Sequence, residues 1–484
     1  MANDSKTNSS VSDNFNSTAK LARNLGFKSQ TSIASKDGKK YNPFDERQVE
    51  HPTSTMGALL HLLKSCLGSG ILAMPAAFKN AGLVAGSIGT FLAGILCTHT
   101  VHLLVRISQK VCIDAKKPSM SFAETCGAAF TYGHPSVRSW GGFIKTLVDY
   151  SLVTTYISVL CVYVVFIGAS FKEVLDTLYP ESKISIQIYC AMTLIPLALV
   201  CQIRNLKYLV PCSAAANLML VVTFAITMYY LFTDIPPASE REMVVSITQW
   251  PLFLSTVIFA MEGIGVVMPI ENQMAKPRQF LGCPGVLNIA MLIVVSLYGI
   301  FGFFGYVKFG DDVKGSVTLN LPEDDWIAQL AKILMALSIY FTYALQFYVP
   351  MEIIWKKLHN RVCERYHNVV QVTLRTVIVS CTVGIAAAFP NLELVISFVG
   401  AIFFSTLGLF IPAAIDTVYR WDKSLGKFNY IAWKNITIMI IAVIALVSGA
   451  YVSVKGMIED FGKHDLEEDI HNTINFTSDA YIDN

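Results

Sequence analysis

The chain has 484 residues, of which 53% are hydrophobic and 15% are charged, whereas a soluble domain carries about 25% charged residues. Its 37 Lys and Arg residues nearly balance its 35 Asp and Glu residues, so the net charge is +2 and no excess of positive charge is available to neutralise phosphates. With a mean hydropathy of +0.50, the composition argues against a soluble enzyme, a disordered protein and a nucleic-acid binder. It indicates an all-α integral membrane protein with many spans.

The N-terminal region differs in composition from the rest of the chain. Residues 1–52 are rich in Ser, Asn, Thr and Lys and contain no apolar stretch. They therefore predict neither a secretory signal nor a separately folded unit. We expect a disordered cytoplasmic tail.

Apolar segments long enough to cross a bilayer follow this tail. A helical span needs about 20 mostly apolar residues. Eleven segments meet this requirement: 55–78, 82–107, 143–170, 184–203, 208–232, 249–274, 284–308, 326–354, 368–389, 393–418 and 430–454. They predict a membrane core over 53–454, with a first half at 55–232, a second half at 249–418 and a last span at 430–454. An acidic non-cytoplasmic tail is expected at 455–484.

Positive charge decides the orientation of these spans. With the N-terminus in the cytoplasm, the inner segments hold 27 of the 37 Lys and Arg residues, as the positive-inside rule requires. The plasma membrane and an endolysosomal membrane both fit this orientation. Asn475 is the Asn-x-Ser/Thr site on the predicted outer side, so it is the expected glycosylation site.

Two spans share an unusual motif. The first span has Gly-x-Gly at 68–70 and Met-Pro at 74–75. The sixth span has Gly-x-Gly at 263–265 and Met-Pro at 268–269. Neighbouring glycines favour unwinding of a helix, although Gly-x-Gly also permits close packing of helices. Its repetition at matching positions is typical of secondary transporters, whose discontinuous helices meet at the midplane. We therefore predict a five-plus-five inverted-repeat transporter core in which the first and sixth of eleven helices are broken.

The two breaks predict a site for a zwitterion with a small side chain. N–H groups around 68–70 can hold its carboxylate, and carbonyl groups around 259–261 can hold its ammonium group. The expected substrate-binding residues are Leu67, Gly68, Ser69, Gly70, Ile71, Phe259, Ala260, Met261, Gly263 and Gly265. The sequence contains no catalytic arrangement, phosphate-binding loop or metal-ligand spacing. We expect a protein that is not an enzyme and that has no metal and no cofactor beyond a coupling proton.

Ionisable residues beside the breaks are candidates for proton coupling. His61 lies about two turns before the first break, and histidine changes charge near physiological pH. Glu262 directly precedes the second break, where it either carries a proton or accepts N–H groups that the break exposes. Glu271 lies near Lys276 and Arg278 and is expected to form a gate or a surface ion pair.

The segments around both breaks resemble the proton-assisted amino acid transporters of the amino acid/auxin permease family, and the chain is similar to insect members. The resemblance rests on His-Leu-Leu-Lys at 61–64, on 68–75, on Phe-Lys-Asn-Ala-Gly at 78–82 and on 262–272. It implies proton-coupled symport of small neutral amino acids of the glycine, alanine and proline type, with His61 as the coupling residue. Some members carry a disulfide in an outer loop, whereas the predicted outer loops of this chain contain no cysteine.

Other functions remain open at this point. Sodium coupling is the nearest alternative, because unwound carbonyl groups also bind Na⁺. A different class is an amino acid sensor, or transceptor, that signals to growth pathways through a cytoplasmic partner. The expected partners are small neutral amino acids, protons and the lipid bilayer, with no nucleic acid.

Overall fold

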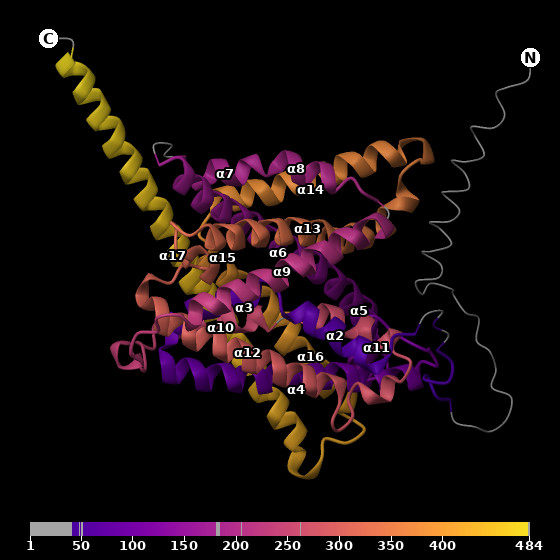
Figure 1. The fold of residues 1–484 in the computed structure, drawn as a ribbon. Coiled ribbons are helices and arrows are strands. Elements are labelled where there is room, and N and C mark those ends of the chain that lie inside the picture. The colour runs from indigo at the N-terminus through magenta and orange to yellow at the C-terminus, as the bar shows by residue number, and fades with distance from the viewer. Residues whose placement is uncertain are drawn as a thin grey trace, which may run out of the picture.

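The described part of the chain is a bundle of helices (Figure 1). The computed structural model describes residues 41–47, 49, 52–180, 184–204, 206–261 and 263–482, without the side chains of 206, 207, 210, 264 and 463–482. Within these residues, the β contact is an isolated parallel bridge between Thr53 and Met274. The all-helical membrane architecture predicted from composition is confirmed.

The helices follow one another along the chain with short connections. The α-helices are α2 (Thr55–Cys66), α3 (Ser69–Ala81), α4 (Leu83–Asp114), α5 (Phe122–Thr131), α6 (Gly141–Leu178), α7 (Ile186–Met192), α8 (Leu194–Val200), α9 (Leu206–Phe232), α10 (Trp250–Ala260), α11 (Ile264–Gln273), α12 (Val286–Phe309), α13 (Trp326–Leu358), α14 (His367–Ala388), α15 (Leu392–Val399), α16 (Ile411–Arg420) and α17 (Tyr430–Ile482). The 3₁₀ segments are η1 (Pro135–Trp140), η2 (Ala238–Glu240), η3 (Pro277–Gln279), η4 (Gly310–Asp312), η5 (Val317–Asn320), η6 (His359–Arg361), η7 (Glu364–Tyr366) and η9 (Lys427–Asn429), and η8 (Gly400–Phe410) is a π-helical segment.

The number of membrane spans is close to the predicted eleven. In the described chain, nine helices are long and apolar enough to cross a bilayer, and the bent pair α2 and α3 makes a tenth if it is counted as one span. The predicted span at 184–203 corresponds to α7 and α8, which together form a shorter apolar segment. The count of eleven and the inverted repeat stay predictions.

Three elements differ from their predicted form. The connection after α4 contains α5, which begins with a capping box: Ser121 accepts from the Glu124 backbone, and Glu124 accepts from the Ser121 backbone. The predicted span 393–418 is divided into α15, η8 and α16, and π-helical segments often occur at functional sites. Helix α17 continues through the predicted tail and leaves the bundle at the upper left of Figure 1. The side chain of Asn475 lies outside the described residues.

Helix α12 packs closely against α3 because it carries glycines at the contact. A Cβ atom on Gly302 would lie 2.3 Å from the Phe78 ring, and a Cβ atom on Gly305 would lie 2.3 Å from the Pro75 side chain. Small residues let helices approach in this way within membranes. Helix α3, the second half of the first broken span, is therefore held firmly against α12.

A second close junction joins α10, η8 and α17. A Cβ atom on Gly400 would lie 2.0 Å from the Ser255 carbonyl oxygen, and one on Gly449 would lie 2.1 Å from the Ser255 hydroxyl oxygen. No side chain larger than hydrogen fits at either glycine without movement of a helix. This junction holds α10 against η8 and α17.

Candidate functional site

The first predicted break lies between α2 and α3. Helix α2 ends at Cys66 and α3 begins at Ser69, and the two axes are bent by 50°. Leu67 leaves the helical conformation with φ −81° and ψ 71°, and Gly68 follows with φ −118° and ψ −143°. No side chain caps the start of α3, so its first N–H groups point into the break without a capping partner.

The second predicted break lies between α10 and α11. Helix α10 ends at Ala260 and α11 begins at Ile264. Gly263, the residue before α11, has φ −152° and ψ −6°, and no side chain caps α11. Glu262, predicted to take part in proton coupling, lies outside the described residues.

The two broken spans meet at their breaks. A Cβ atom on Gly70 would lie 2.7 Å from the Cα atom of Ala260, so backbone rests on backbone at this point. A Cβ atom on Gly263 would lie 3.2 Å from the Cys66 Sγ atom. Helix α3 packs on α10, and α2 packs on α11 (Figure 1). The predicted site is therefore assembled from residues almost 200 positions apart in the sequence.

A tyrosine from α12 joins the two breaks. The Tyr298 hydroxyl group shares its single hydrogen between the carbonyl oxygen of Cys66 and that of Ala260, the latter at 2.7 Å. These carbonyls belong to the last residues of α2 and α10, which the breaks free from helical hydrogen bonding. Tyr298 is completely buried. The sequence analysis missed this residue, because a single tyrosine in an apolar span carries no sign of its partner.

A second tyrosine contacts the start of α11. A Cβ atom on Gly265 would lie 2.6 Å from the Tyr156 hydroxyl oxygen of α6. The absence of a side chain at Gly265 therefore lets a hydroxyl group from α6 reach the first turn of α11. This contact adds a polar atom to the surroundings of the second break.

The space beside the breaks is narrow in the described residues. A cavity of about 20 Å³ lies between Met261, Gly263, Cys97 of α4 and Phe404 of η8, which is enough for about one water molecule. The backbone at Gly68 faces open space, since no atom lies within 4 Å of its Cβ position. Passage of a substrate larger than water therefore requires the helices to separate.

The predicted substrate-binding residues divide into two environments. Gly70 is buried, and Ile71, Phe259, Ala260 and Met261 are each at most 5% exposed, so these five residues form the packed side of the junction. Those that are partly exposed are Leu67, Gly68, Ser69, Gly263 and Gly265. The structure thus brings the two predicted segments together and turns one side of them toward accessible space.

His61 lies on the exposed face of α2, five residues before the helix ends. Ser65 on the next turn donates to the His61 carbonyl oxygen at 2.9 Å. Lys64, also on this face, donates to the Ser213 hydroxyl of α9 at 3.1 Å. The imidazole of His61 is therefore accessible, and its lysine neighbour connects this face of α2 to α9.

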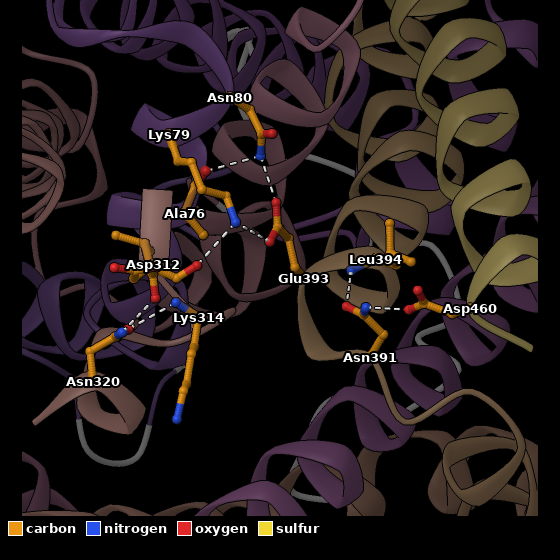
Figure 2. Close-up of polar contacts among 11 residues, drawn as sticks. Ala76, Lys79, Asn80, Asp312, Lys314, Asn320, Asn391, Glu393, Leu394 and Asp460 are labelled. Carbon is orange, nitrogen blue, oxygen red and sulfur yellow. Dashed lines mark hydrogen bonds and ion pairs between the residues drawn. The ribbon is translucent and has the colours of Figure 1, made fainter. Parts of the chain in front are cut away.

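A polar cluster holds the far end of α3 against α15 (Figure 2). Lys79 pairs with Glu393 at 2.9 Å and donates to the Val313 carbonyl oxygen at 3.0 Å. Asn80, which is buried, donates to the other Glu393 carboxylate oxygen at 2.7 Å. We call Lys79, Asn80 and Glu393 the α3 latch, because they connect the end of α3 to α15 and to the loop after α12.

The α3 latch continues through α15 to α17. Asn391 caps α15 by accepting from the Leu394 N–H group at 3.2 Å. The Asn391 amide also donates to Asp460 of α17 at 2.5 Å (Figure 2). Helix α3, the second half of the first broken span, is thus connected through α15 to the last helix.

A buried ion pair holds the far end of α11. Arg47 and Glu271 lie 3.1 Å apart, with side chains 6% and 1% exposed. Arg47 also donates to the Pro118 carbonyl oxygen at 2.8 Å, and Gln109 donates to Glu271 at 3.0 Å. We call Arg47 and Glu271 the α11 latch.

The α11 latch corrects two expectations. Glu271 pairs with Arg47 rather than with Lys276 or Arg278, and the pair is buried rather than at the surface. The guanidinium groups of Arg47 and Arg278 lie over the Phe44 ring at 5.2 and 5.6 Å. The described residues between 41 and 47 therefore pack on the bundle, although they belong to the segment 1–52 that the sequence predicts as a tail.

A family match over most of the chain agrees with this architecture. Residues 51–455 match the family described as "Transmembrane amino acid transporter protein". The chain belongs to this family. The family description names amino acid transport, which is not an enzymatic activity.

Relatives with curated names point in the same direction. The chain is 38% identical over 428 residues to "Proton-coupled amino acid transporter-like protein pathetic" of Drosophila melanogaster, covering 88% of this chain and 90% of the relative. It is 27% identical over 323 residues to "Vacuolar amino acid transporter 4" of Saccharomyces cerevisiae, covering 65% of this chain and 42% of that protein. The resemblance to amino acid permeases, and to the insect members among them, is thereby confirmed.

Two solved structures show a more distant likeness. The structure titled "Inward facing conformation of Mhp1" aligns with a TM-score of 0.46 and 11% identity over 90% of this chain and 96% of that chain. The structure of MhsT in complex with L-phenylalanine aligns with a TM-score of 0.44 and 14% identity over 84% of this chain and 99% of that chain.

Proposed function

We propose that this protein is a proton-coupled symporter of small neutral amino acids that works by alternating access. The observation that carries the proposal is the contact of the two helix breaks, where Gly70 lies against Ala260 and Tyr298 binds both freed carbonyls. Backbone freed inside a membrane protein is tolerated where it lines a cavity or a binding site. Two such breaks in contact form the arrangement that discontinuous helices use to hold a substrate at mid-membrane depth.

The chemistry of the junction suits a zwitterion. The uncapped start of α3 at Ser69 and Gly70 offers N–H groups to a carboxylate. The Ala260 carbonyl oxygen has a second lone pair beside the bond from Tyr298 and can accept an ammonium group, whereas the Cys66 carbonyl oxygen already accepts from both Tyr298 and the Gly68 N–H group. The narrow space and the backbone contact at Gly70 favour substrates of the glycine, alanine and proline type.

His61 is the proposed coupling residue. Its side chain is exposed on α2 and lies one turn from Lys64. A proton on His61 would place two positive charges three residues apart on one helix face, which is unfavourable. Protonation thereby favours movement of α2, and Glu262 is a second candidate proton carrier. The name of the Drosophila relative, which includes proton coupling, supports this proposal.

The two latches have roles in alternating access. In the predicted orientation, with the N-terminus in the cytoplasm, the α3 latch lies at the outer end and the α11 latch at the inner end. Each latch therefore holds the half-helix that lies nearest its own face of the membrane. A cycle that opens one side at a time requires these two connections to break at different steps, in the plasma membrane or in an endolysosomal membrane.

Uptake into proteoliposomes tests the proposal. Purified protein is reconstituted, and labelled glycine, alanine and proline are added under a proton gradient and, separately, under a sodium gradient at equal pH. We expect accumulation that depends on the proton gradient and is lost in His61→Ala while the protein still folds. Accumulation driven by sodium alone would show that the coupling ion is Na⁺ and not the proton. Binding without accumulation under either gradient would reject transport.

One contact supports sensing as a second candidate function. Arg47 connects the N-terminal segment to Glu271 at the end of α11, so movement of α11 is transmitted to the residues that precede the first span. Deleting residues 1–40, which leaves the α11 latch intact, separates the two functions. Loss of growth signalling with normal uptake would support a transceptor that signals through residues 1–40, and retention of both would show that these residues do not carry a signal.

A further inference from the structure

A groove of about 640 Å³ runs between α4 and α12 on the outside of the bundle. Its α4 wall includes Phe91, Ile95 and His102, and its α12 wall includes Asn288, Leu292 and Ile300. Both helices lie side by side at the lower edge of the bundle in Figure 1. The part of α4 that lines the groove covers four turns, or about 22 Å, which is most of the thickness of a bilayer core.

The side chains along this groove face lipid. Phe91, Ile95 and Leu292 are 56%, 53% and 65% exposed, and apolar surface of this size on a membrane span contacts acyl chains. The groove therefore does not need a protein partner to cover it. Its occupant comes from the bilayer.

Glycines make the groove hollow rather than flat. A Cβ atom on Gly94 would lie 2.3 Å from a Val295 methyl group, so α4 and α12 touch at this level. Gly299, one turn farther along α12, has no atom within 4 Å of its Cβ position. The missing side chain at Gly299 leaves a channel into which a flexible chain fits.

One end of the groove is polar and positively charged. His102 Nε2 lies 2.7 Å from the Asn288 Oδ1 atom, and His99 Nε2 lies 2.8 Å from the Lys434 Nζ atom of α17. Arg106 is exposed on the next turn of α4 beyond His102. These groups form a basic end whose four members lie on two neighbouring helices.

The other charged groups near the basic end leave it positive. Asp416 of α16 is the neighbouring carboxylate, and it binds Arg420 at 2.6 Å and Asn435 at 2.9 Å. Lys110 of α4 adds a further positive charge to the Arg420 and Asp416 group. The basic end therefore favours an anion.

Aromatic residues place the basic end at the membrane surface. Tyr430 and Trp433, at the start of α17 beside Lys434, are 60% and 68% exposed. Exposed Tyr and Trp residues gather at the level of lipid headgroups. In the predicted orientation this is the cytoplasmic leaflet, which carries anionic lipids.

We propose that the groove binds an anionic phospholipid. Its acyl chain lies between α4 and α12 over Gly299, and its phosphate lies at the basic end formed by His99, His102, Arg106 and Lys434. The apolar length of the groove requires a lipid rather than free phosphate. The basic end selects an anionic headgroup over a zwitterionic one.

Lipid in this groove contacts the same turn of α12 that holds the helix breaks. Gly299 faces the groove, and Tyr298 beside it donates to Cys66 and Ala260 on the opposite face. An occupied groove supports this turn from the bilayer side. We therefore expect the bound lipid to affect the junction of the broken spans as well as the surface.

Photochemical labelling tests the proposal. The purified full chain is incubated with phosphatidylserine that carries a diazirine in an acyl chain, or with phosphatidylcholine labelled in the same way, and the labelled peptides are identified by mass spectrometry. We expect phosphatidylserine to label peptides of α4 and α12 about tenfold more than phosphatidylcholine does, since each nearby basic residue favours an anionic lipid. The double variant Arg106→Gln with Lys434→Gln should bring the two lipids to equal labelling.

A groove-filling variant separates this site from ordinary annular lipid. Gly299→Leu should fold, because its Cβ position is open, and should lose the labelling of α4 and α12. Gly384→Leu on α14 is the matched control, because Gly384 also has no atom within 4 Å of its Cβ position. Equal labelling of all membrane-facing helices, equal labelling by the two lipids in the unmodified protein, or labelling unchanged in Gly299→Leu would each overturn the proposal.

Discussion

The Tyr298 hydroxyl group lies 2.7 Å from the carbonyl oxygen of Ala260, the last helical residue before the second break. The same hydroxyl group donates to Cys66, the last helical residue before the first break. One side chain on an unbroken helix thus holds the ends of two broken ones. The distance between the breaks depends on this tyrosine.

Tyr298→Phe is expected to weaken this junction. The Cys66 carbonyl keeps its hydrogen bond from the Gly68 N–H group, but the buried Ala260 carbonyl is left without its donor, which costs about 1–3 kcal/mol. Because the two carbonyls border the proposed ammonium site, uptake of glycine should fall more than stability alone explains. Thermal unfolding in detergent and initial uptake rates in proteoliposomes measure the two effects.

Tyr343→Phe is the matched control for this prediction. Tyr343 is also completely buried in a span, and its hydroxyl group binds Thr382 at 2.7 Å, away from the breaks. The variant should lower stability to a similar degree and keep the uptake rate per folded molecule. If both tyrosine variants lost uptake equally, the special position of Tyr298 would be disproved.

Two glycines of the first break should respond differently to alanine. Gly70→Ala places a methyl group 2.7 Å from the Ala260 Cα atom, and this contact is with backbone that cannot rotate away. We expect loss of folded protein or of transport. Gly68→Ala meets no atom within 4 Å, so the protein should fold, and the uptake of proline should fall more than that of glycine. Equal folding yields and equal uptake for the two variants would contradict the observed packing.

The α3 latch predicts a shift between transport states. Lys79 and Glu393 are about one-fifth exposed, so their pair contributes at most about 1 kcal/mol. Glu393→Gln should therefore change the population of the outward-open state by about fivefold or less, and the apparent KM at the outer side should fall by the same factor. Lys79→Met, which removes the other member of the same pair, should lower the KM by a similar factor. An unchanged apparent KM in the single variants would show that the α3 latch does not open during transport.

The α11 latch predicts a larger effect on stability. Arg47→Ala leaves the Glu271 carboxylate buried without its guanidinium partner, and loss of one member of a buried pair costs about 3–5 kcal/mol. The exposed pair of Lys314 with Glu173 provides the control, because an exposed pair contributes at most about 1 kcal/mol. Thermal unfolding of Arg47→Ala and Lys314→Ala in detergent compares them. If Arg47→Ala unfolded at the same temperature as the unmodified protein, the latch would have no structural role.

Asp325, which caps α13, predicts a dependence of stability on pH. The hydrogen bond from the Tyr230 hydroxyl group, and then that from the Ile327 N–H group, hold the pKa of Asp325 below its ordinary value of 3.8. Because the pKa is lower in the folded state, the stabilisation is present above pH 3.8 and is lost as pH falls through the depressed pKa. Asp325→Asn should therefore unfold at a lower temperature than the unmodified protein at pH 6.

The difference between the two proteins should narrow as the pH is lowered below 3.8. Asp324→Asn, a change at the preceding residue, is the control and should leave the pH profile unchanged. A constant difference between Asp325→Asn and the unmodified protein at all pH values would contradict the role of the ionised carboxylate.

The positions of the breaks could be predicted because their cause is local. Gly68 and Gly263 stand in short motifs that disfavour a continuous helix, and both breaks begin within two residues of these glycines. Pro75 and Pro269, by contrast, lie inside α3 and α11 without ending them. The prolines therefore marked the motif without causing the break.

The latches and the bridging tyrosine could not be predicted because their cause is tertiary. Lys79 and Glu393 are 314 positions apart and Arg47 and Glu271 are 224 apart, so no local pattern connects either pair. Helix α5 was missed for a different reason, since its ten residues are too few to span a membrane. Length and hydropathy find spans, whereas the contacts between spans require coordinates.

The most direct test of the proposed symport measures proton movement driven by the substrate. Proteoliposomes with a pH-sensitive dye inside receive external glycine at equal internal and external pH, in sodium-free buffer. Since coupling is reciprocal, inward glycine movement should acidify the interior, and His61→Ala should abolish the acidification. Entry of glycine without any change of internal pH would contradict proton-coupled symport.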